Sequence, residues 1–176
     1  MNFLEYADTD MLAIDLANTL AGELTMALDH QNRVSFVVPG GTTPGPIFDD
    51  LCDADLDWSR VDVLPSDERC VPEVHVRSNA RMIRNRLLTG RASKARYVTM
   101  YDKTFTPEDM ATQLSDVIAP MLPISVCLLG MGEDMHTASL FPDADNLDAL
   151  LAKRAPNVLS TRAPSVSEPR ITLSAH

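Results

Sequence analysis

The sequence predicts an α/β fold, with a mostly parallel, doubly wound (Rossmann-like) sheet and helices on both faces. Segments with the composition of strands alternate along the chain with segments of helical periodicity, an order that is typical of parallel sheets. The expected strands are apolar nearly throughout, as in sheets that are covered on both faces. No internal repeat or linker divides the 176 residues. We therefore expect a single α/β domain over residues 1–176, with one core.

The first half of the chain begins with an expected helix over residues 9–30, for which Thr9 or Asp10 is the expected N-cap. A short apolar strand over residues 33–38 follows and runs into a Pro-Gly-Gly-Thr-Thr-Pro turn. Thr43 as N-cap and Pro44 as the first helical residue would then open a helix to about residue 51. The first helix is expected because five leucines at intervals of four form one apolar row: Leu12, Leu16, Leu20, Leu24 and Leu28.

The second half continues the alternation. Ser78 is expected to cap one helix, and Thr106 followed by Pro107 to open another. Expected helices cover residues 78–88, 106–118 and 145–152, and expected strands cover residues 61–64, 96–100, 124–129, 157–160 and 170–173. The apolar run over residues 124–129 gives the strongest strand prediction.

Composition excludes several classes of partner. The formal net charge of −10 makes nucleic acid and anionic membranes poor partners, and an anionic small molecule would need a local cluster of donors. No apolar run approaches the roughly 20 residues that cross a bilayer, and the N-terminus does not have the pattern of a secretory signal. The three cysteines lack metal-type spacing, which indicates reduced thiols and a cytoplasmic location.

Candidate chemistry follows three of the expected strands, where open parallel sheets bind ligands. The first segment is Gly40-Gly41-Thr42-Thr43. Its glycines allow close backbone approach to an anion, and a following helix would offer free N–H groups. It matches neither the Walker nor the dinucleotide pattern, so no nucleotide cofactor is expected. The simpler alternative is an ordinary glycine turn before a capped helix.

The second segment is Asp67-Glu68-Arg69. The planar fork of Arg69 can grip a phosphate, and Asp67 can position a hydroxyl, a water or a histidine. A solvated charged loop is the alternative interpretation of such a triplet.

The third segment runs from Gly130 to Phe141 and contains His136. A neutral imidazole accepts a proton near pH 7, so His136 is the candidate general base, and a nearby carboxylate can orient its ring. The alternative is a histidine that is hydrogen-bonded within a loop. No spacing resembles a zinc site, and no Gly-x-Ser-x-Gly elbow is present. A metal cofactor and a serine nucleophile are therefore not expected.

Four segments resemble the signatures of the 6-phosphogluconolactonases, in the glucosamine/galactosamine-6-phosphate isomerase family, in order and spacing. They are residues 38–44, residues 67–72 with Ser78-Asn79 downstream, residues 130–142, and Arg170-Ile171-Thr172-Leu173. The resemblance implies a fold similar to that of glucosamine-6-phosphate deaminases and ribose-5-phosphate isomerases. It also implies cytoplasmic, metal-free and cofactor-free hydrolysis of 6-phosphoglucono-δ-lactone in the oxidative pentose phosphate pathway, by a monomer or weak homo-oligomer.

The resemblance further implies residue roles. His136 would activate the water that attacks the lactone carbonyl, and Asp67 would assist at the sugar end. Gly41, Thr42 and Arg69 would hold the phosphate, with Arg170 as a further contributor. We also expect Gly40, Thr43 and Arg162 to contact the substrate, Arg162 from a predicted loop.

Two departures from the family pattern stand out. Met135 occupies the position before the histidine where the family usually has glycine. If that position requires a positive φ, the methionine costs roughly 1 kcal/mol or more; otherwise its side chain lines the pocket. Family members also run further, and a parallel strand over residues 170–173 would need a crossover of a dozen or more residues after it. We therefore expect an incomplete representative of the fold, truncated at its C-terminus.

Two other functions remain open on the sequence. One is an amino-sugar-phosphate deaminase/isomerase, which would also use a phosphate loop, an aspartate and a histidine. The run His136-Thr137-Ala138-Ser139-Leu140-Phe141-Pro142 favours the lactonase, because it lacks the Asn-Gly-His-Ile-Ala-Phe-Asn-Glu type of run found in deaminases. The other is a non-catalytic module that binds sugar phosphates.

Overall fold

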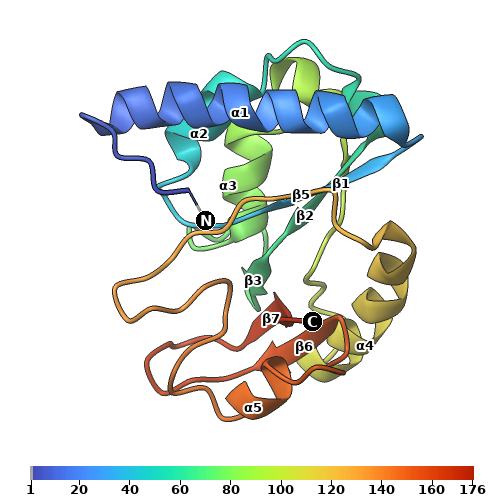
Figure 1. Ribbon diagram of the computed structural model, residues 1–176. Helices are drawn as coiled ribbons and strands as arrows, with labels where there is room; N and C mark the ends of the chain where they lie inside the picture. Colours follow the sequence, from blue (N-terminus) through green and yellow to red (C-terminus); the bar gives the residue numbers. More distant parts are fainter. Residues whose placement is uncertain (1) are drawn as a thin grey trace.

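The computed structural model describes residues 2–176. Its centre is a four-stranded parallel sheet in the order β4-β2-β1-β5 (Figure 1). The strands are β1 (Val34–Val38), β2 (Val61–Pro65), β4 (Arg96–Tyr97) and β5 (Val126–Cys127). All five residues of β1 pair with β2, and both strands are buried along their whole length. The predicted α/β fold is thus confirmed, with the parallel sheet as its core.

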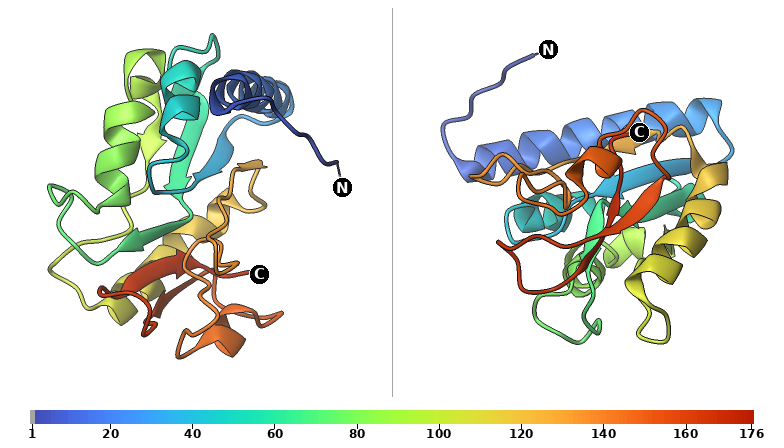
Figure 2. Two further views of the ribbon diagram at one scale, coloured as in Figure 1. Left: turned by 90° about the vertical axis from the view of Figure 1, so that its left-hand side faces the viewer. Right: turned by 90° about the horizontal axis from the view of Figure 1, so that it is seen from below.

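Helices cover both faces of this sheet, as predicted. Successive residues of a strand point to opposite faces, so one strand packs against the helices on both sides. Phe36 and Val38 pack in one apolar cluster with α1, α2 and α3, whereas Val37 packs in a second cluster with α4 (Figure 2). The helices are α1 (Thr9–His30), α2 (Gly45–Leu51), α3 (Asn79–Arg86), α4 (Pro107–Ile118) and α5 (Leu147–Leu150), with 3₁₀ turns η1 (Trp58–Arg60), η2 (Gly90–Lys94) and η3 (Ala119–Met121).

A second, antiparallel sheet was not predicted. It has the order β3-β7-β6 and comprises β3 (Asp67–Arg69), β6 (Val158–Thr161) and β7 (Arg170–Leu173). The expectation of a parallel strand over residues 170–173 is wrong, since β7 is the central strand of this sheet and antiparallel to both neighbours. An apolar, β-branched pattern indicates a strand but contains no information on its partners or direction.

Helix starts show where local capping rules suffice. Ser78 caps α3 and Thr106 caps α4, each accepting a backbone N–H bond as predicted. The cap of α1 is Asp8 rather than Thr9 or Asp10; its carboxylate accepts from the N–H of Met11. The Thr43 prediction is also wrong, because α2 begins at Gly45 and has no side-chain cap.

The first helix differs from its prediction in one further respect. By length and composition alone, α1 is apolar enough to cross a membrane, although the sequence shows no continuous apolar run of that length. A helix that packs on a sheet passes the same test. Here Ala13, Ala17, Leu20, Leu24 and Leu28 are buried against the core.

The most strongly predicted strand, β5, is one of the two shortest in its sheet; the other is β4. Only Val126 and Cys127 of the expected residues 124–129 pair, and they pair with β1 alone. After Leu128, whose N–H donates to the carbonyl of Val37, the chain leaves the sheet. Because the segment that follows β5 does not pair in the sheet, it can line the cavity at the strand ends that is described below.

Candidate active site

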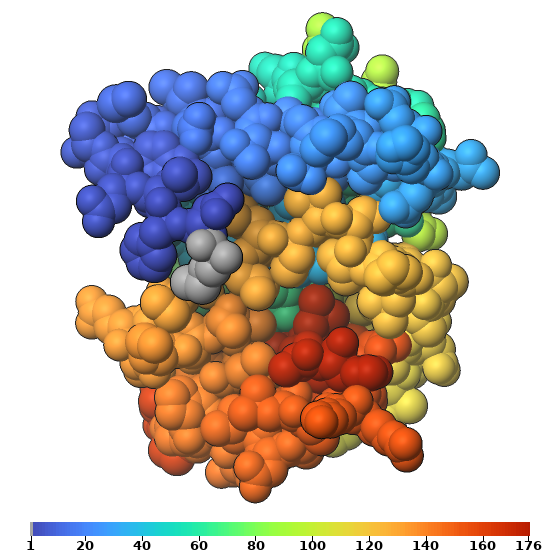
Figure 3. All heavy atoms as spheres, in the orientation of Figure 1, coloured from blue at the N-terminus to red at the C-terminus, as the bar shows by residue number. Residues whose placement is uncertain are grey.

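A cavity of about 480 Å³ lies at the carboxyl ends of the parallel strands. It is bounded by the loop after β1, the start of β3, the segment that follows β5, and β7. Figure 3 shows this face of the molecule, with α1 above and the segment after β5 below. Leu12 and Leu16 of α1 form part of an apolar wall together with Ile47, Leu128 and Leu129. The parallel-sheet rule placed the site at this edge, and the cavity is where it predicted.

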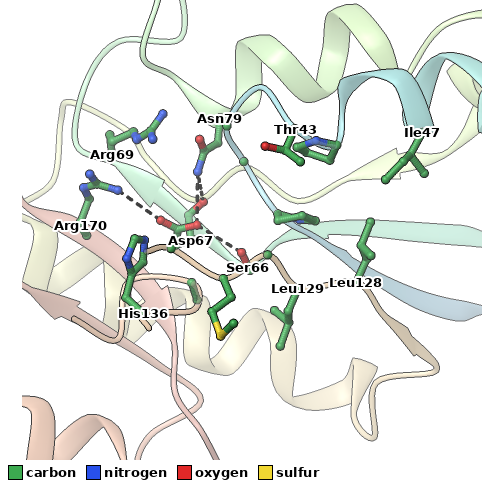
Figure 4. Close-up of a pocket in the computed structure, with 18 of the residues that line it drawn as sticks. Thr43, Ile47, Ser66, Asp67, Arg69, Asn79, Leu128, Leu129, His136 and Arg170 are labelled. Carbon is green, nitrogen blue, oxygen red and sulfur yellow. Dashed lines mark hydrogen bonds and ion pairs between the residues drawn. The ribbon is translucent and has the colours of Figure 1, made fainter. Parts of the chain in front are cut away.

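Asp67 lies at the centre of the polar wall and is 6% exposed (Figure 4). Its carboxylate accepts from Ser139 Oγ at 2.6 Å and Ser66 Oγ at 3.2 Å. It also forms a buried ion pair with Arg170, whose Nη1 lies 3.4 Å away. The Nδ2 of Asn79 adds a longer bond at 3.3 Å. A buried charge requires this kind of partner set, which fixes the carboxylate at the pocket wall.

His136 lines the same cavity and lies beside Arg170 and Asp67 (Figure 4). Its Nδ1 lies 2.5 Å from Oδ1 of Asp134. A carboxylate only accepts, so in the neutral ring Nδ1 bears the proton and Nε2 has the lone pair. The hydrogen bond from His136 holds the pKa of the exposed Asp134 carboxyl below its usual value, so Asp134 is ionised at neutral pH. The carboxylate orients the ring, as the sequence suggested for a nearby acid.

Phe141 supports two of the polar groups at once. It is 3% exposed, and its ring centroid lies 4.5 Å from that of His136. The guanidinium carbon of Arg170 lies 5.4 Å from the same centroid on the Phe141 ring. Cations and polar rings pack favourably on an aromatic face. Phe141 therefore ties the position of the candidate base to that of the arginine beside Asp67.

The loop Gly40–Thr43, called the β1–α2 loop below, forms the part of the cavity nearest α2. Gly41 has φ +83°, a conformation that glycine adopts without cost. Within residues 2–176, the N–H groups of Gly41 and Thr42 donate to no acceptor. Since α2 has only seven residues, the helix dipole adds little, and these loop N–H groups are the donors that the segment offers an anion.

Arg69 lines the same cavity and makes no ion pair with a carboxylate among the described residues. Its Nη1 donates to the carbonyl of Arg77 at 2.5 Å, and its Nε is buried with no partner among the described residues. The neighbouring Glu68 is turned away from the cavity and accepts from the N–H groups of Asn79 and Ala80 at the start of α3. Burial raises the pKa of Glu68, and these N–H groups oppose the rise.

Most predicted site residues meet in this cavity, and two do not. Those that line it are Gly40, Gly41, Thr43, Asp67, Arg69, His136 and Arg170. Thr42 and Arg162 are exposed and are not part of its wall. Arg162 is the first residue after β6 and lies on the surface. The geometry therefore gives no support to a substrate-binding role for the side chains of Thr42 and Arg162, whereas the backbone N–H of Thr42 remains one of the free donors of the loop.

Sequence reasoning missed three residues that organise the site: Asn79, Ser139 and Phe141. Asn79 and Ser139 both bond Asp67 from distant parts of the chain. All three lie within the segments that carried the family resemblance, which is the signal that marks them. Their contacts are long-range, so spacing within each segment gave no indication of a role.

Met135, beside the candidate base, has φ +70° and is 71% exposed. The position therefore does require the left-handed conformation that the family's usual glycine would explain, and the alternative of ordinary backbone with a pocket-lining methionine is wrong. The strain lies in a tight turn, in which the N–H of Met135 donates to the carbonyl of Gly132 and the N–H of Gly132 to the carbonyl of His136.

Replacing Met135 with glycine should raise the free energy of unfolding by about 0.5–1 kcal/mol, because relief of left-handed strain exceeds the entropy that glycine adds to the unfolded chain. Urea denaturation measures the change. Met135→Ala is the matched control, since alanine retains the Cβ that causes the strain. Equal stabilisation by both substitutions would contradict the strain argument.

No metal centre is evident in the part of the chain that the structure describes: residues 2–176 contain no group of three or more His, Cys, Asp or Glu side chains that could hold an ion.

Comparison with known families identifies this arrangement. The model of the family described as glucosamine-6-phosphate isomerases/6-phosphogluconolactonase matches residues 7–176. The chain belongs to this family. A 6-phosphogluconolactonase of Pseudomonas aeruginosa is 42% identical over 160 residues, which cover 90% of this chain and 67% of that protein. The corresponding protein of Pseudomonas putida is 39% identical over 176 residues and is covered to 71%.

Solved structures of the family agree with the fold. The crystal structure of a 6-phosphogluconolactonase from Shewanella baltica superposes with a TM-score of 0.92 at 34% identity, over 96% of this chain and 72% of that one. That of a Neisseria gonorrhoeae protein described as a putative 6-phosphogluconolactonase gives a TM-score of 0.86 at 30% identity. The parallel sheet and the added antiparallel sheet are thus features that this chain shares with the family.

Proposed function

We propose that this family member is a 6-phosphogluconolactonase, which hydrolyses 6-phosphoglucono-δ-lactone to 6-phosphogluconate with His136 as general base. The observation that supports it most directly is the imidazole of His136. It is oriented by Asp134. It shares one cavity with Asp67, Arg69 and Arg170 (Figure 4). Relatives that carry the lactonase name and exceed 35% identity support the same substrate.

The geometry suggests the following chemistry. Water lies against Nε2 of His136, which takes its proton as the water oxygen bonds to the lactone carbonyl carbon. The ester bond to the ring oxygen then breaks, and the imidazolium returns its proton to that oxygen. Asp134 accepts from Nδ1–H throughout and stabilises the charged ring. The product is the open-chain acid, which ionises.

The polar groups that share the cavity with His136 would hold the substrate. Asp67 is fixed by its ion pair and hydrogen bonds and can accept from a sugar hydroxyl. Burial lowers the pKa of Arg170, and the Asp67 carboxylate opposes this effect; the guanidinium remains charged at neutral pH. Arg69 and the free N–H groups of the β1–α2 loop supply the local donors that an anionic substrate of a −10 chain requires. We propose that they bind its phosphate.

The deciding experiment is a hydrolysis assay on freshly generated 6-phosphogluconolactone, corrected for the spontaneous reaction. Turnover well above that background supports the proposal. Tight binding of 6-phosphogluconate without turnover would indicate a binding module instead, and release of ammonia from glucosamine 6-phosphate would indicate a deaminase. We further propose a cytoplasmic protein that acts as a monomer or weak homo-oligomer.

Activity should survive exhaustive dialysis against a chelator, because the proposed base is an imidazole that needs no metal-bound water. The rate is measured before and after dialysis, with a dialysis against chelator-free buffer as the control. A loss of activity that added divalent metal restores would contradict the mechanism.

A further inference from the structure

The side chain of Asn79 lies between two parts of the cavity wall, Asp67 and the β1–α2 loop, and contacts both. It is 1% exposed, and its Nδ2 donates to the backbone carbonyl of Asp67 at 2.8 Å and to Oδ1 of Asp67 at 3.3 Å. Its own N–H donates to Oε1 of Glu68 at 2.8 Å. As the first residue of α3, after the Ser78 cap, Asn79 has a backbone that is fixed independently of its side chain.

The other side of the same amide faces the β1–α2 loop. A Cβ on Gly40 would lie 1.9 Å from Oδ1 of Asn79, 2.1 Å from its Cγ and 2.4 Å from its Nδ2. These are its three nearest neighbours, so the loop packs directly on the amide. Gly40 does not have the positive φ that Gly41 has. Glycine at position 40 is therefore required for space and not for backbone conformation.

The amide has only one orientation that fits. Both of its contacts on Asp67 are acceptors, so the NH₂ group must face Asp67 and Oδ1 must face Gly40. In the described part of the chain, Oδ1 has no hydrogen-bond partner. A buried polar atom without a partner is costly, and burial of this one is imposed by the close contact with the loop.

We propose that Asn79 is a positioning residue, which sets the distance from the β1–α2 loop to Asp67, and that Gly40 is its required partner. This inference rests on the proposed function. A phosphosugar lactone must place its phosphate at the loop and its ring beside Asp67 at the same time. The separation of these two walls therefore decides how well a substrate with both groups is bound and oriented.

The test compares Asn79→Ala, Gly40→Ala and the double variant on 6-phosphogluconolactone and on unphosphorylated gluconolactone. Loss of a hydrogen bond to a charged group predicts that Asn79→Ala lowers kcat/KM for the phosphorylated lactone by roughly 10- to 100-fold. The unphosphorylated lactone uses one wall only and should lose less than about threefold. Equal losses on both lactones would mean a general structural defect and would overturn the proposal.

The double variant tests the contact itself. Gly40→Ala should lower kcat/KM for the phosphorylated lactone by about tenfold or more in the parent, because the new Cβ displaces the Asn79 amide. In the Asn79→Ala background the obstructing atoms are gone, so Gly40→Ala should cost less than about threefold. Fully multiplicative effects would overturn the link. Gly22→Ala is the matched control, since a Cβ there meets nothing within 4 Å.

Thermal unfolding of every variant separates folding from positioning. If Gly40→Ala does not fold but the double variant does, the rescue supports the contact. If neither folds, the kcat/KM of Asn79→Ala for the phosphorylated lactone, relative to that for the unphosphorylated lactone, decides. A parent protein without lactone turnover would defeat the proposed function, and that result is distinct from an active parent in which the two substitutions act independently.

Discussion

Replacement of His136 with alanine should lower kcat for 6-phosphogluconolactone by roughly 10²–10⁴-fold, the usual effect of a lost general base. The imidazole contributes to the transition state by taking the proton of water, whereas the phosphate and the sugar hydroxyls of the substrate are proposed to be bound by other groups. Binding of 6-phosphogluconate should therefore change little. Steady-state kinetics and calorimetric titration of the product measure the two quantities separately.

Two further variants make this result specific. His30→Ala is the matched control, because His30 lies in the last turn of α1, away from the cavity, and its replacement should leave kcat unchanged. Asp134→Ala should lower kcat by less than His136→Ala, since Asp134 only orients the ring, and should add no further loss in the absence of the imidazole. Near-normal turnover by His136→Ala would remove the histidine from the mechanism.

The sequence predicted the features of this site that depend on local rules. Apolar periodicity and caps gave α1, α3 and α4, and the placement of ligands at strand ends brought Asp67 and His136 to one cavity. The capping rule failed at α2, where the helix begins at Gly45, Pro44 takes the N-cap position and no side chain caps the first turn.

Sequence periodicity could not predict which distant segments pair with one another. Arg170 comes beside Asp67 because β7 pairs antiparallel with β3, which places residues 103 apart in the sequence in one ion pair. The sequence indicated a strand at β7 but assigned it to the wrong kind of sheet. Arg170 was nevertheless among the expected ligands, because the family resemblance implied a role for it that periodicity alone could not predict.

Arg69 is expected to make the largest single contribution to recognition of the phosphate. Its side chain reaches the cavity from β3, and one of its nitrogens is held by the carbonyl of Arg77 at 2.5 Å. This bond fixes the plane of the guanidinium before the substrate arrives. Because Nε is buried, Nη2 and the second hydrogen of Nη1 are the donors left for a phosphate, and a planar pair of this kind can form two parallel bonds.

Arg69→Ala should therefore weaken binding of 6-phosphogluconate by roughly 1.5–3 kcal/mol, the range for charge-assisted hydrogen bonds. Unphosphorylated gluconate should bind the parent and the variant equally weakly. Arg69→Lys should recover only part of the loss, because a point charge cannot replace the fork. Calorimetric titration at fixed ionic strength measures all three. Arg91→Ala is the control, since Arg91 pairs with exposed Asp55 outside the cavity. If Arg69→Ala weakened both ligands equally, Arg69 would support the fold of the pocket and not bind the phosphate.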